Sequence, residues 1–258
     1  MIDTHAHIYS EEFDTDRGLV IERAQKAGVK KIILPNIDST SLQAMLLLER
    51  DYPEFCYAAI GLHPTSVDEK YEQELKIVES ELQQREYIAV GEIGIDLYWD
   101  KSFVKEQIIA FQKQVELAIK YNIPVIIHVR DSLKETLKAL IPYKDDNLKG
   151  IFHSFGGSID EAKEIFTYGD FYLGINGIVT FKNSKLSEVV KSIGLERIVL
   201  ETDSPYLTPA PYRGKRNESS YLTIIAQKIA EVLEISYEAV IEQTTKNAFY
   251  IFNLNRNR

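Results

Sequence analysis

The chain has 258 residues and a net charge of −9, with 45% hydrophobic and 27% charged residues. This balance is ordinary for a soluble globular protein, and it argues against broad, sequence-independent binding to duplex DNA, which depends on many Lys and Arg contacts. The only cysteine, Cys56, excludes an internal disulfide, and without a long apolar run or a basic, apolar leader we expect a cytoplasmic protein with no membrane partner.

Short apolar, β-branched runs alternate along the chain with stretches of helical periodicity. The predicted strands are 1–7, 30–37, 55–63, 87–95, 123–129, 149–155, 171–177 and 197–203. The helical stretches between them are 17–27, 39–51, 71–85, 103–121, 131–140, 158–168 and 186–193. Two more helices are predicted at 221–233 and 237–252, and Ser236 is a suitable N-cap for the last one.

This alternation of strands and helices predicts a parallel sheet. Eight such units in a chain of this length suit a closed (β/α)8 TIM barrel, here with additional C-terminal helices. An open, doubly wound sheet is the alternative. We favour closure because the first and eighth strands both end in polar clusters, which closure would make neighbours. We therefore expect one barrel domain over residues 1–258.

All five histidines lie at or near the C-terminal end of a predicted strand. His5 and His7 end the first strand, His63 the third, His128 the fifth and His153 the sixth. Any one of them alone would more often be a hydrogen-bonded core residue than a metal ligand. In a barrel, however, these ends form a single face where active sites are built, so the five are expected to meet.

Two carboxylates fall at the same ends, Glu92 on the fourth strand and Asp203 after the eighth. Imidazole and carboxylate bind borderline divalent metals, carboxylate also suits Mg²⁺, and a carboxylate can bridge two ions. We therefore predict a site for two divalent ions (Mg, Mn or Zn) about 3.5–4 Å apart. One ion is assigned to His5, His7, Glu92 and Asp203, and the other to Glu92, His128 and His153.

Other residues near these strand ends are candidates for contacts with substrate. His63, in GLHP, is interpreted in this way, and Arg130 follows the fifth strand. The alternative for Arg130 is a surface ion pair with Asp131 or with a neighbouring helix. Arg213 lies in the loop PAPYRGKRNES after the eighth strand, and Tyr206 could stack on a base.

The HxH opening, GLHP, VGEIGID, IIHVRD, HSFGGS and LETDSPYLTP together resemble the TatD family of metal-dependent deoxyribonucleases, which belongs to the amidohydrolase-like barrels. The resemblance runs from Ile2 to about Phe252. It implies a TIM barrel, a divalent metal site and hydrolysis of DNA phosphodiesters, with an exonuclease acting on single strands or ends. The family's metal ligands map onto His5, His7, Glu92, His128, His153 and Asp203.

In this interpretation metal-activated water attacks the phosphodiester, Glu92 holds both ions, and Asp203 accepts the water's proton. Glu201 and Asp3 are expected to orient ligands. An amidohydrolase or lactonase acting on a C–N or ester bond is the alternative function. Many such relatives carry a carboxylated lysine where this chain has Glu92, which argues against it. A non-catalytic barrel is a third possibility, and no obligate protein partner is evident.

Overall fold

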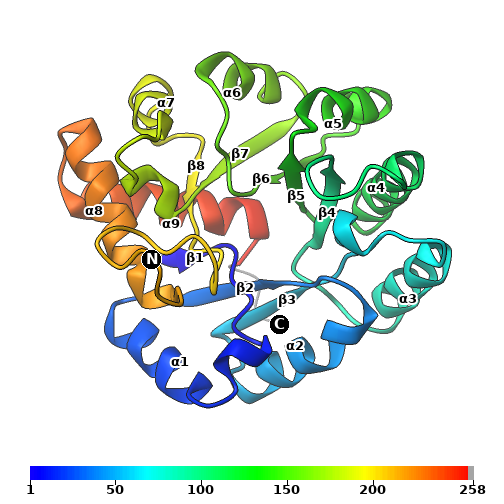
Figure 1. The fold of residues 1–258 in the computed structure, drawn as a ribbon, viewed down its shortest axis with the longest axis horizontal. Helices are drawn as coiled ribbons and strands as arrows, with labels where there is room; N and C mark the ends of the chain where they lie inside the picture. The colour runs from blue at the N-terminus through cyan, green and yellow to red at the C-terminus, as the bar shows by residue number, and fades with distance from the viewer. Residues whose placement is uncertain (255–258) are drawn as a thin grey trace.

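The computed structural model describes residues 1–254, and its eight strands form a ring surrounded by helices (Figure 1). The strands are β1 (Ile2–Asp3), β2 (Lys31–Pro35), β3 (Cys56–Ala59), β4 (Val90–Asp96), β5 (Val125–Arg130), β6 (Lys149–Phe152), β7 (Asp170–Ile175) and β8 (Ile198–Leu200). The helices are α1 (Arg17–Lys26), α2 (Ser39–Asp51), α3 (Tyr71–Gln84), α4 (Val104–Tyr121), α5 (Leu133–Leu140), α6 (Ile159–Ile165), α7 (Leu186–Ile193), α8 (Leu222–Leu233) and α9 (Tyr237–Phe252).

Within each of two sheets, every strand pairs in parallel with the next one along the chain. Strands β1 to β3 form one sheet, and β4 to β8 form another. Isolated parallel bridges cross the two seams, Ile60 with Val90 between β3 and β4, and Ala6 with Ser204 beside β1 and β8. The predicted TIM barrel with additional C-terminal helices is therefore confirmed, and the first and last strands are neighbours.

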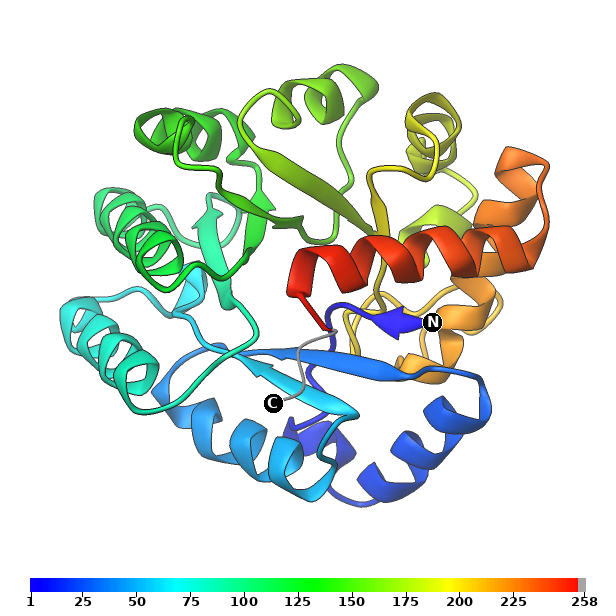
Figure 2. The ribbon, with the colours of Figure 1, turned by 180° about the vertical axis from the view of Figure 1, so that it is seen from behind.

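Successive strand residues belong to two different apolar clusters, as expected when side chains alternate between the faces of a sheet. Ile127 of β5 packs with the surrounding helices, whereas its neighbour Ile126 joins a cluster with Ile151 and Val199. The second cluster also contains residues of α9, the helix that crosses the far end of the barrel (Figure 2). This end is thus closed by an apolar floor, and functional groups must lie nearer the C-terminal ends of the strands.

Local capping sets several helix ends where the sequence predicts them. The Ser236 hydroxyl accepts a hydrogen bond from the N–H of Ala239 at 3.1 Å, which confirms Ser236 as the N-cap of α9. Asp38 caps α2 by accepting from the N–H of Thr40 at 3.0 Å. Helix α4 ends at Asn122, which takes a left-handed conformation with φ of 52°. Within residues 1–254, no helix has both the length and the apolar character needed to cross a bilayer.

The first strand is shorter than the predicted 1–7, since β1 ends at Asp3. The next residues pair instead with the segment that follows β8. The N–H of His7 donates to the carbonyl of Ser204 at 2.8 Å, and the N–H of Asp203 donates to the carbonyl of His5 at 2.9 Å. The two histidines are therefore positioned by the seam of the barrel, and the prediction of a strand that continues to residue 7 is wrong.

Candidate metal centre

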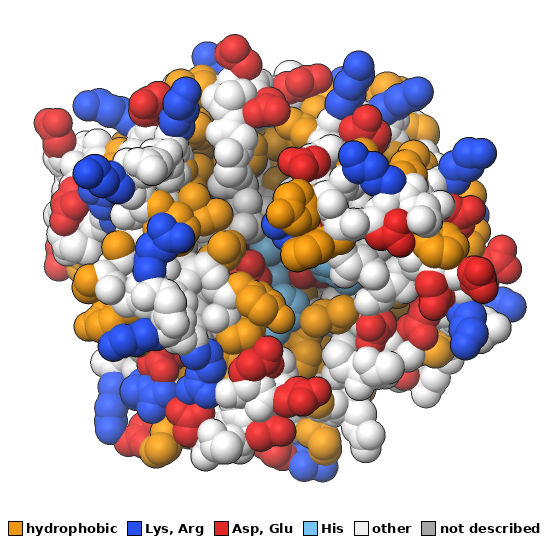
Figure 3. Space-filling view, viewed as in Figure 1, with side chains coloured by type: hydrophobic (Ala, Val, Ile, Leu, Met, Phe, Trp, Pro, Cys, Tyr) orange, Lys and Arg blue, Asp and Glu red, His pale blue; other side chains and the backbone are white. Residues whose placement is uncertain are grey.

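A cavity of about 640 Å³ opens at the C-terminal ends of the strands. Figure 3 shows it as a hollow with histidine side chains at its base. Its walls include Glu92, Asp96, His128, His153 and Asp203. His5 lies beneath them and is fully buried. The structure thus brings together, at one end of the barrel, side chains that are up to about 200 residues apart in the chain.

Four donor atoms meet where β1 and β8 adjoin β4. The Nε2 atoms of His5 and His7 are 3.1 Å apart, and they lie 3.2 and 3.6 Å from Glu92 Oε2. Asp203 Oδ1 is 3.6 Å from His5 Nε2 and 3.8 Å from His7 Nε2. Ligand atoms around a tetrahedral ion with bonds of about 2.1 Å are separated by about 3.4 Å. The spacing of these four atoms therefore fits one divalent ion.

The hydrogen bonds of His7 leave its Nε2 free to act as a ligand. The Tyr9 hydroxyl donates its one proton to the carbonyl of Pro35 at 2.6 Å. It must then accept from His7 Nδ1, which is 2.8 Å away. Nδ1 therefore carries the proton of the neutral ring, and Nε2 presents a lone pair to the other donor atoms. Such a partner on the far nitrogen is typical of metal-binding histidines.

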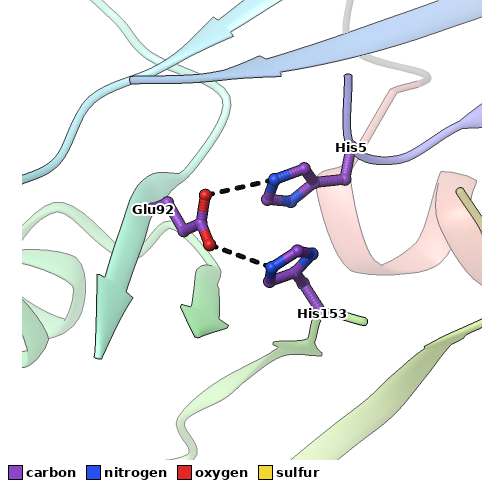
Figure 4. Close-up of side chains that lie close together, drawn as sticks. All are labelled: His5, Glu92 and His153. Atoms are coloured by element: carbon purple, nitrogen blue, oxygen red, sulfur yellow. Dashed lines mark ion pairs between the residues drawn. The ribbon is translucent and has the colours of Figure 1, made fainter. Parts of the chain in front are cut away.

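Glu92 directs its two carboxylate oxygens to different groups of histidines. Oε2 faces His5, while Oε1 lies 2.9 Å from His153 Nε2 (Figure 4). Oε1 is also 2.9 Å from His128 Nδ1 and 3.4 Å from His63 Nε2. A second group of donors thus surrounds Oε1, and Glu92 is the carboxylate common to both groups.

A second carboxylate, Asp96, fixes the ring of His128. Asp96 Oδ2 lies 2.9 Å from His128 Nε2, so the opposite nitrogen, Nδ1, faces Glu92. Gly94 allows β4 to approach β5 at this point, because a Cβ at Gly94 would lie 2.0 Å from the carbonyl oxygen of His128. Asp96 is a functional candidate that the sequence interpretation missed. Its position four residues after Glu92, on the same face of a strand, could have suggested it.

The buried Glu201 carboxylate lies behind His153. Its Oε1 is 3.4 Å from His153 Nδ1 and accepts from the N–H of Ser154 at 2.6 Å. Gly174 makes room for it, because a Cβ there would lie 2.0 Å from Glu201 Oε2. Asp3 has different contacts, since its carboxylate accepts from the N–H and hydroxyl of Thr202. Glu201 is thus placed to orient a histidine, whereas Asp3 joins β1 to the end of β8.

His63 lies closer to the Glu92 carboxylate than the sequence suggests. Its Nε2 is 3.4 Å from Glu92 Oε1 and 3.3 Å from His128 Nδ1. Its Nδ1 accepts from the backbone N–H of Thr65 at 3.1 Å. The proton of the neutral ring is therefore on Nε2, which points toward Glu92 as a donor. Burial lowers the pKa of His63, which favours this neutral form. A ring held in this state suits a contact to a substrate oxygen better than a bond to a metal.

Burial and close charges shift the pKa values of the central groups. Burial lowers the pKa of His7 to about 4 and raises that of Asp203 to about 8. Burial opposes ionisation of Glu92, but the surrounding histidines, His153 first, hold its pKa well below the usual range. An anionic Glu92 beside a neutral His7 is the state that a divalent cation requires.

Of the four predicted substrate residues, three line this cavity, His63 among them, and one does not. Arg130 and Tyr206 lie in its wall. Arg213 lies outside this cavity, and its guanidinium is 4.0 Å from the centre of the Phe181 ring. It lies beside a separate hollow of about 880 Å³ that contains none of the histidines. Arg216, from the same loop, forms an ion pair with Asp16 at 2.8 Å.

Comparisons with known proteins agree with this architecture. A model of the family described as TatD related DNase matches residues 2–253. The chain is 40% identical over 256 residues to the uncharacterized metal-dependent hydrolase YabD of Bacillus subtilis, covering 99% of this chain and all of YabD. It is 29% identical to the 3'-5' ssDNA/RNA exonuclease TatD of Erwinia tasmaniensis, covering 98% of this chain and 100% of that protein.

Among solved structures, the TatD homologue YjjV of Escherichia coli superposes with a TM-score of 0.91 at 28% identity, covering 98% of each chain. The sequence match and the structural match both extend over nearly the whole barrel, including every strand that carries a candidate ligand. The chain belongs to the TatD-related DNase family, a family of metal-dependent hydrolases.

Proposed function

We propose that this protein hydrolyses phosphodiester bonds of DNA, starting from the ends of single strands, with the help of two divalent ions. The observation that carries the proposal is the position of Glu92, whose two oxygens face two separate groups of nitrogen donors at 2.9–3.2 Å. A carboxylate shared in this way is typical of sites for two metal ions that act on phosphate esters.

In this proposal one ion is held by His5, His7, Glu92 and Asp203, and the other by Glu92, His128 and His153. When bound, the two ions would lower the pKa of water toward about 7 and offset the charge that builds up on the phosphate. His63 stays outside both sets, because its Nδ1 is occupied by the N–H of Thr65.

The remaining roles follow from the positions of the side chains. Asp203 turns Oδ1 toward His5 and His7, so we assign acceptance of the proton from the attacking water to Oδ2. The Nε2–H of His63 would donate to an oxygen of the phosphate. Arg130 would contribute a positive charge from the cavity wall.

The choice of nucleic acid as substrate rests on the family match and on the name of the Erwinia tasmaniensis relative, a 3'-5' ssDNA/RNA exonuclease. A cavity of about 640 Å³ suits one or two nucleotides at a strand end better than a continuous duplex. The acidic chain, with its net charge of −9, is also a poor match for extended, nonspecific contact with duplex phosphates.

The test is digestion of single-stranded and duplex oligonucleotides labelled at either end, with Mg²⁺, Mn²⁺ or Zn²⁺. We expect single strands to be shortened from the 3' end in a metal-dependent reaction that His5→Ala and Asp203→Asn abolish, with both variants folded by circular dichroism. Lactones and cyclic amides are screened in parallel. Turnover of these compounds with no cleavage of any oligonucleotide would overturn the proposal in favour of an amidohydrolase.

A further inference from the structure

Three side chains form an exposed aromatic and cationic cluster at the mouth of the cavity. Tyr98 and Trp99 follow β4 and are 53% and 68% exposed. Their rings meet edge to face, with centroids 5.0 Å apart. The guanidinium of Arg130, at the end of β5, lies 3.8 Å from the centre of the Tyr98 ring and 5.1 Å from that of Trp99. Trp99 and Arg130 both line the cavity that holds the histidines.

The cluster is fixed to the candidate metal centre by one carboxylate. Asp96 Oδ1 accepts from the backbone N–H groups of Tyr98 and Trp99 at 2.9 and 3.2 Å. The other oxygen of the same carboxylate, Oδ2, lies 2.9 Å from His128 Nε2. A shift of the loop backbone would therefore disturb His128, so the position of the loop is coupled to the candidate metal centre.

Neither packing nor ion pairing within the chain accounts for these groups. Among residues 1–254, Trp99 has the highest exposed fraction of the large hydrophobic residues, and it forms a patch with Tyr98 at the wall of the cavity, as is typical of ligand-binding sites. Among residues 1–254, no carboxylate oxygen lies within 4.0 Å of the Arg130 guanidinium, so the predicted alternative, an ion pair with Asp131, does not form. The cluster offers the exposed ring of Trp99 together with a positive charge that has no carboxylate partner among the described residues.

We propose that Tyr98, Trp99 and Arg130 form a stacking platform for an unpaired nucleobase next to the scissile phosphate. The inference rests on the proposed function and specifies which part of the substrate is recognised. Every base presents a π-face to an aromatic ring, so the platform selects single strands and ends without selecting sequence. A base inside a duplex has both faces covered by its neighbours, so it cannot lie on Trp99.

Trp99 is the only tryptophan of the chain, so its emission reports on this site alone. The metal-free protein, kept in chelator, is titrated with a single-stranded oligonucleotide and with the same strand ending in an abasic residue. We expect saturable quenching by the strand with a terminal base and about 5- to 150-fold weaker binding of the abasic strand. Equal quenching by both strands, or none by either, would overturn the platform.

Kinetics provide a second readout on the same pair of strands. Stacking of about 1–3 kcal/mol per base corresponds to about 5- to 150-fold in affinity. We expect KM of the wild-type protein to be lower by this factor for the strand with a terminal base than for the abasic one. Trp99→Ala should reduce the ratio of the two KM values to near one, and Trp99→Phe should restore most of it.

The matched control is Tyr250→Ala, which removes an aromatic ring that is 56% exposed on α9, at the other end of the barrel (Figure 2). It should leave the ratio at its wild-type value. If Trp99→Ala keeps a wild-type ratio, the platform is refuted while the nuclease proposal stands. If the wild-type protein cleaves neither strand, the nuclease proposal fails, and the fluorescence titration still decides whether Trp99 binds a base.

Discussion

Replacing Gly174 by alanine should displace the buried Glu201 carboxylate and, through it, His153. The new Cβ would lie 2.0 Å from Glu201 Oε2 and 2.5 Å from its Cδ. The carboxylate would have to retreat by about 1.4 Å to regain an ordinary van der Waals distance. It is fully buried and is held by the N–H of Ser154 at 2.6 Å, so this movement breaks a short hydrogen bond.

Two costs follow from this displacement. Overpacking of a close-packed interior typically lowers the free energy of unfolding by about 1–3 kcal/mol, or about 2–6 °C in melting temperature for a chain of this size. In addition, His153 Nδ1 loses the carboxylate that lies 3.4 Å away. Loss of such a partner behind a metal-binding histidine typically weakens metal affinity by about 10- to 100-fold.

The assay combines thermal unfolding in chelator with calorimetric titration of Mn²⁺ or Zn²⁺. Gly156→Ala is the matched control, because a Cβ at Gly156, which lies in the segment between β6 and α6, meets no other atom within 4 Å. Gly156→Ala should change neither the melting temperature nor the metal affinity. Wild-type stability and metal affinity in Gly174→Ala would refute the reasoning. A loss of stability with wild-type affinity would show that Glu201 is a packing residue and does not support His153.

Three more predictions test other contacts. Tyr9→Phe should weaken metal affinity by about 10- to 100-fold, because His7 Nδ1 loses its acceptor at 2.8 Å. The same calorimetric titration measures this change. Unchanged affinity would mean that another contact sets the tautomer of His7. Mn²⁺ or Zn²⁺ at about 100 times its Kd should raise the free energy of unfolding by about 2.7 kcal/mol, and equal melting curves in metal and in chelator would contradict a metal site. Burial opposes ionisation of Glu218, but Arg23, in contact at 2.6 Å, holds the pKa of Glu218 below its usual 4.5. The ion pair therefore contributes its full stabilisation of the folded state above pH 4.5. This contribution is lost as the pH falls through the lowered pKa. Glu218→Gln should therefore cost about 1–2 kcal/mol at pH 7 and progressively less below pH 4.5 in urea unfolding, and a cost that does not vary with pH would argue against the ion pair.

Much of the fold could be predicted because the local signals agree with one another. Helices α2, α7 and α9 have the predicted bounds, and α2 and α9 begin after side-chain caps that are visible in the sequence. The order of strands and helices limits the fold to a few parallel arrangements, of which the barrel is one. Strand ends were predicted less well, since the pairing that ends β1 at Asp3 depends on contacts with β8, about 200 residues away.

The convergence of the histidines with Glu92 and Asp203 was predicted, but Asp96 and the internal arrangement of the site were not. Positions at strand ends indicate that the histidines and carboxylates should converge, and the structure brings them together. The hydrogen bonds that fix ring tautomers, such as that of Tyr9 to His7, require coordinates. The same is true of Arg213, whose loop folds toward Phe181 and away from the histidines.

At the seam beside β1 and β8, the contacts that close the ring of strands also bring His5 and His7 to Asp203. His5 and His7 precede Asp203 by about 200 residues, and the floor helix α9 follows later still, so the two imidazoles are made long before the carboxylate that faces them. A nascent or truncated chain that lacks its final quarter has neither the carboxylate that faces the two imidazoles nor the partner strand that holds them. A site that holds all four of these donor atoms, Glu92 Oε2 included, therefore forms only after the segment that carries Asp203 has been made.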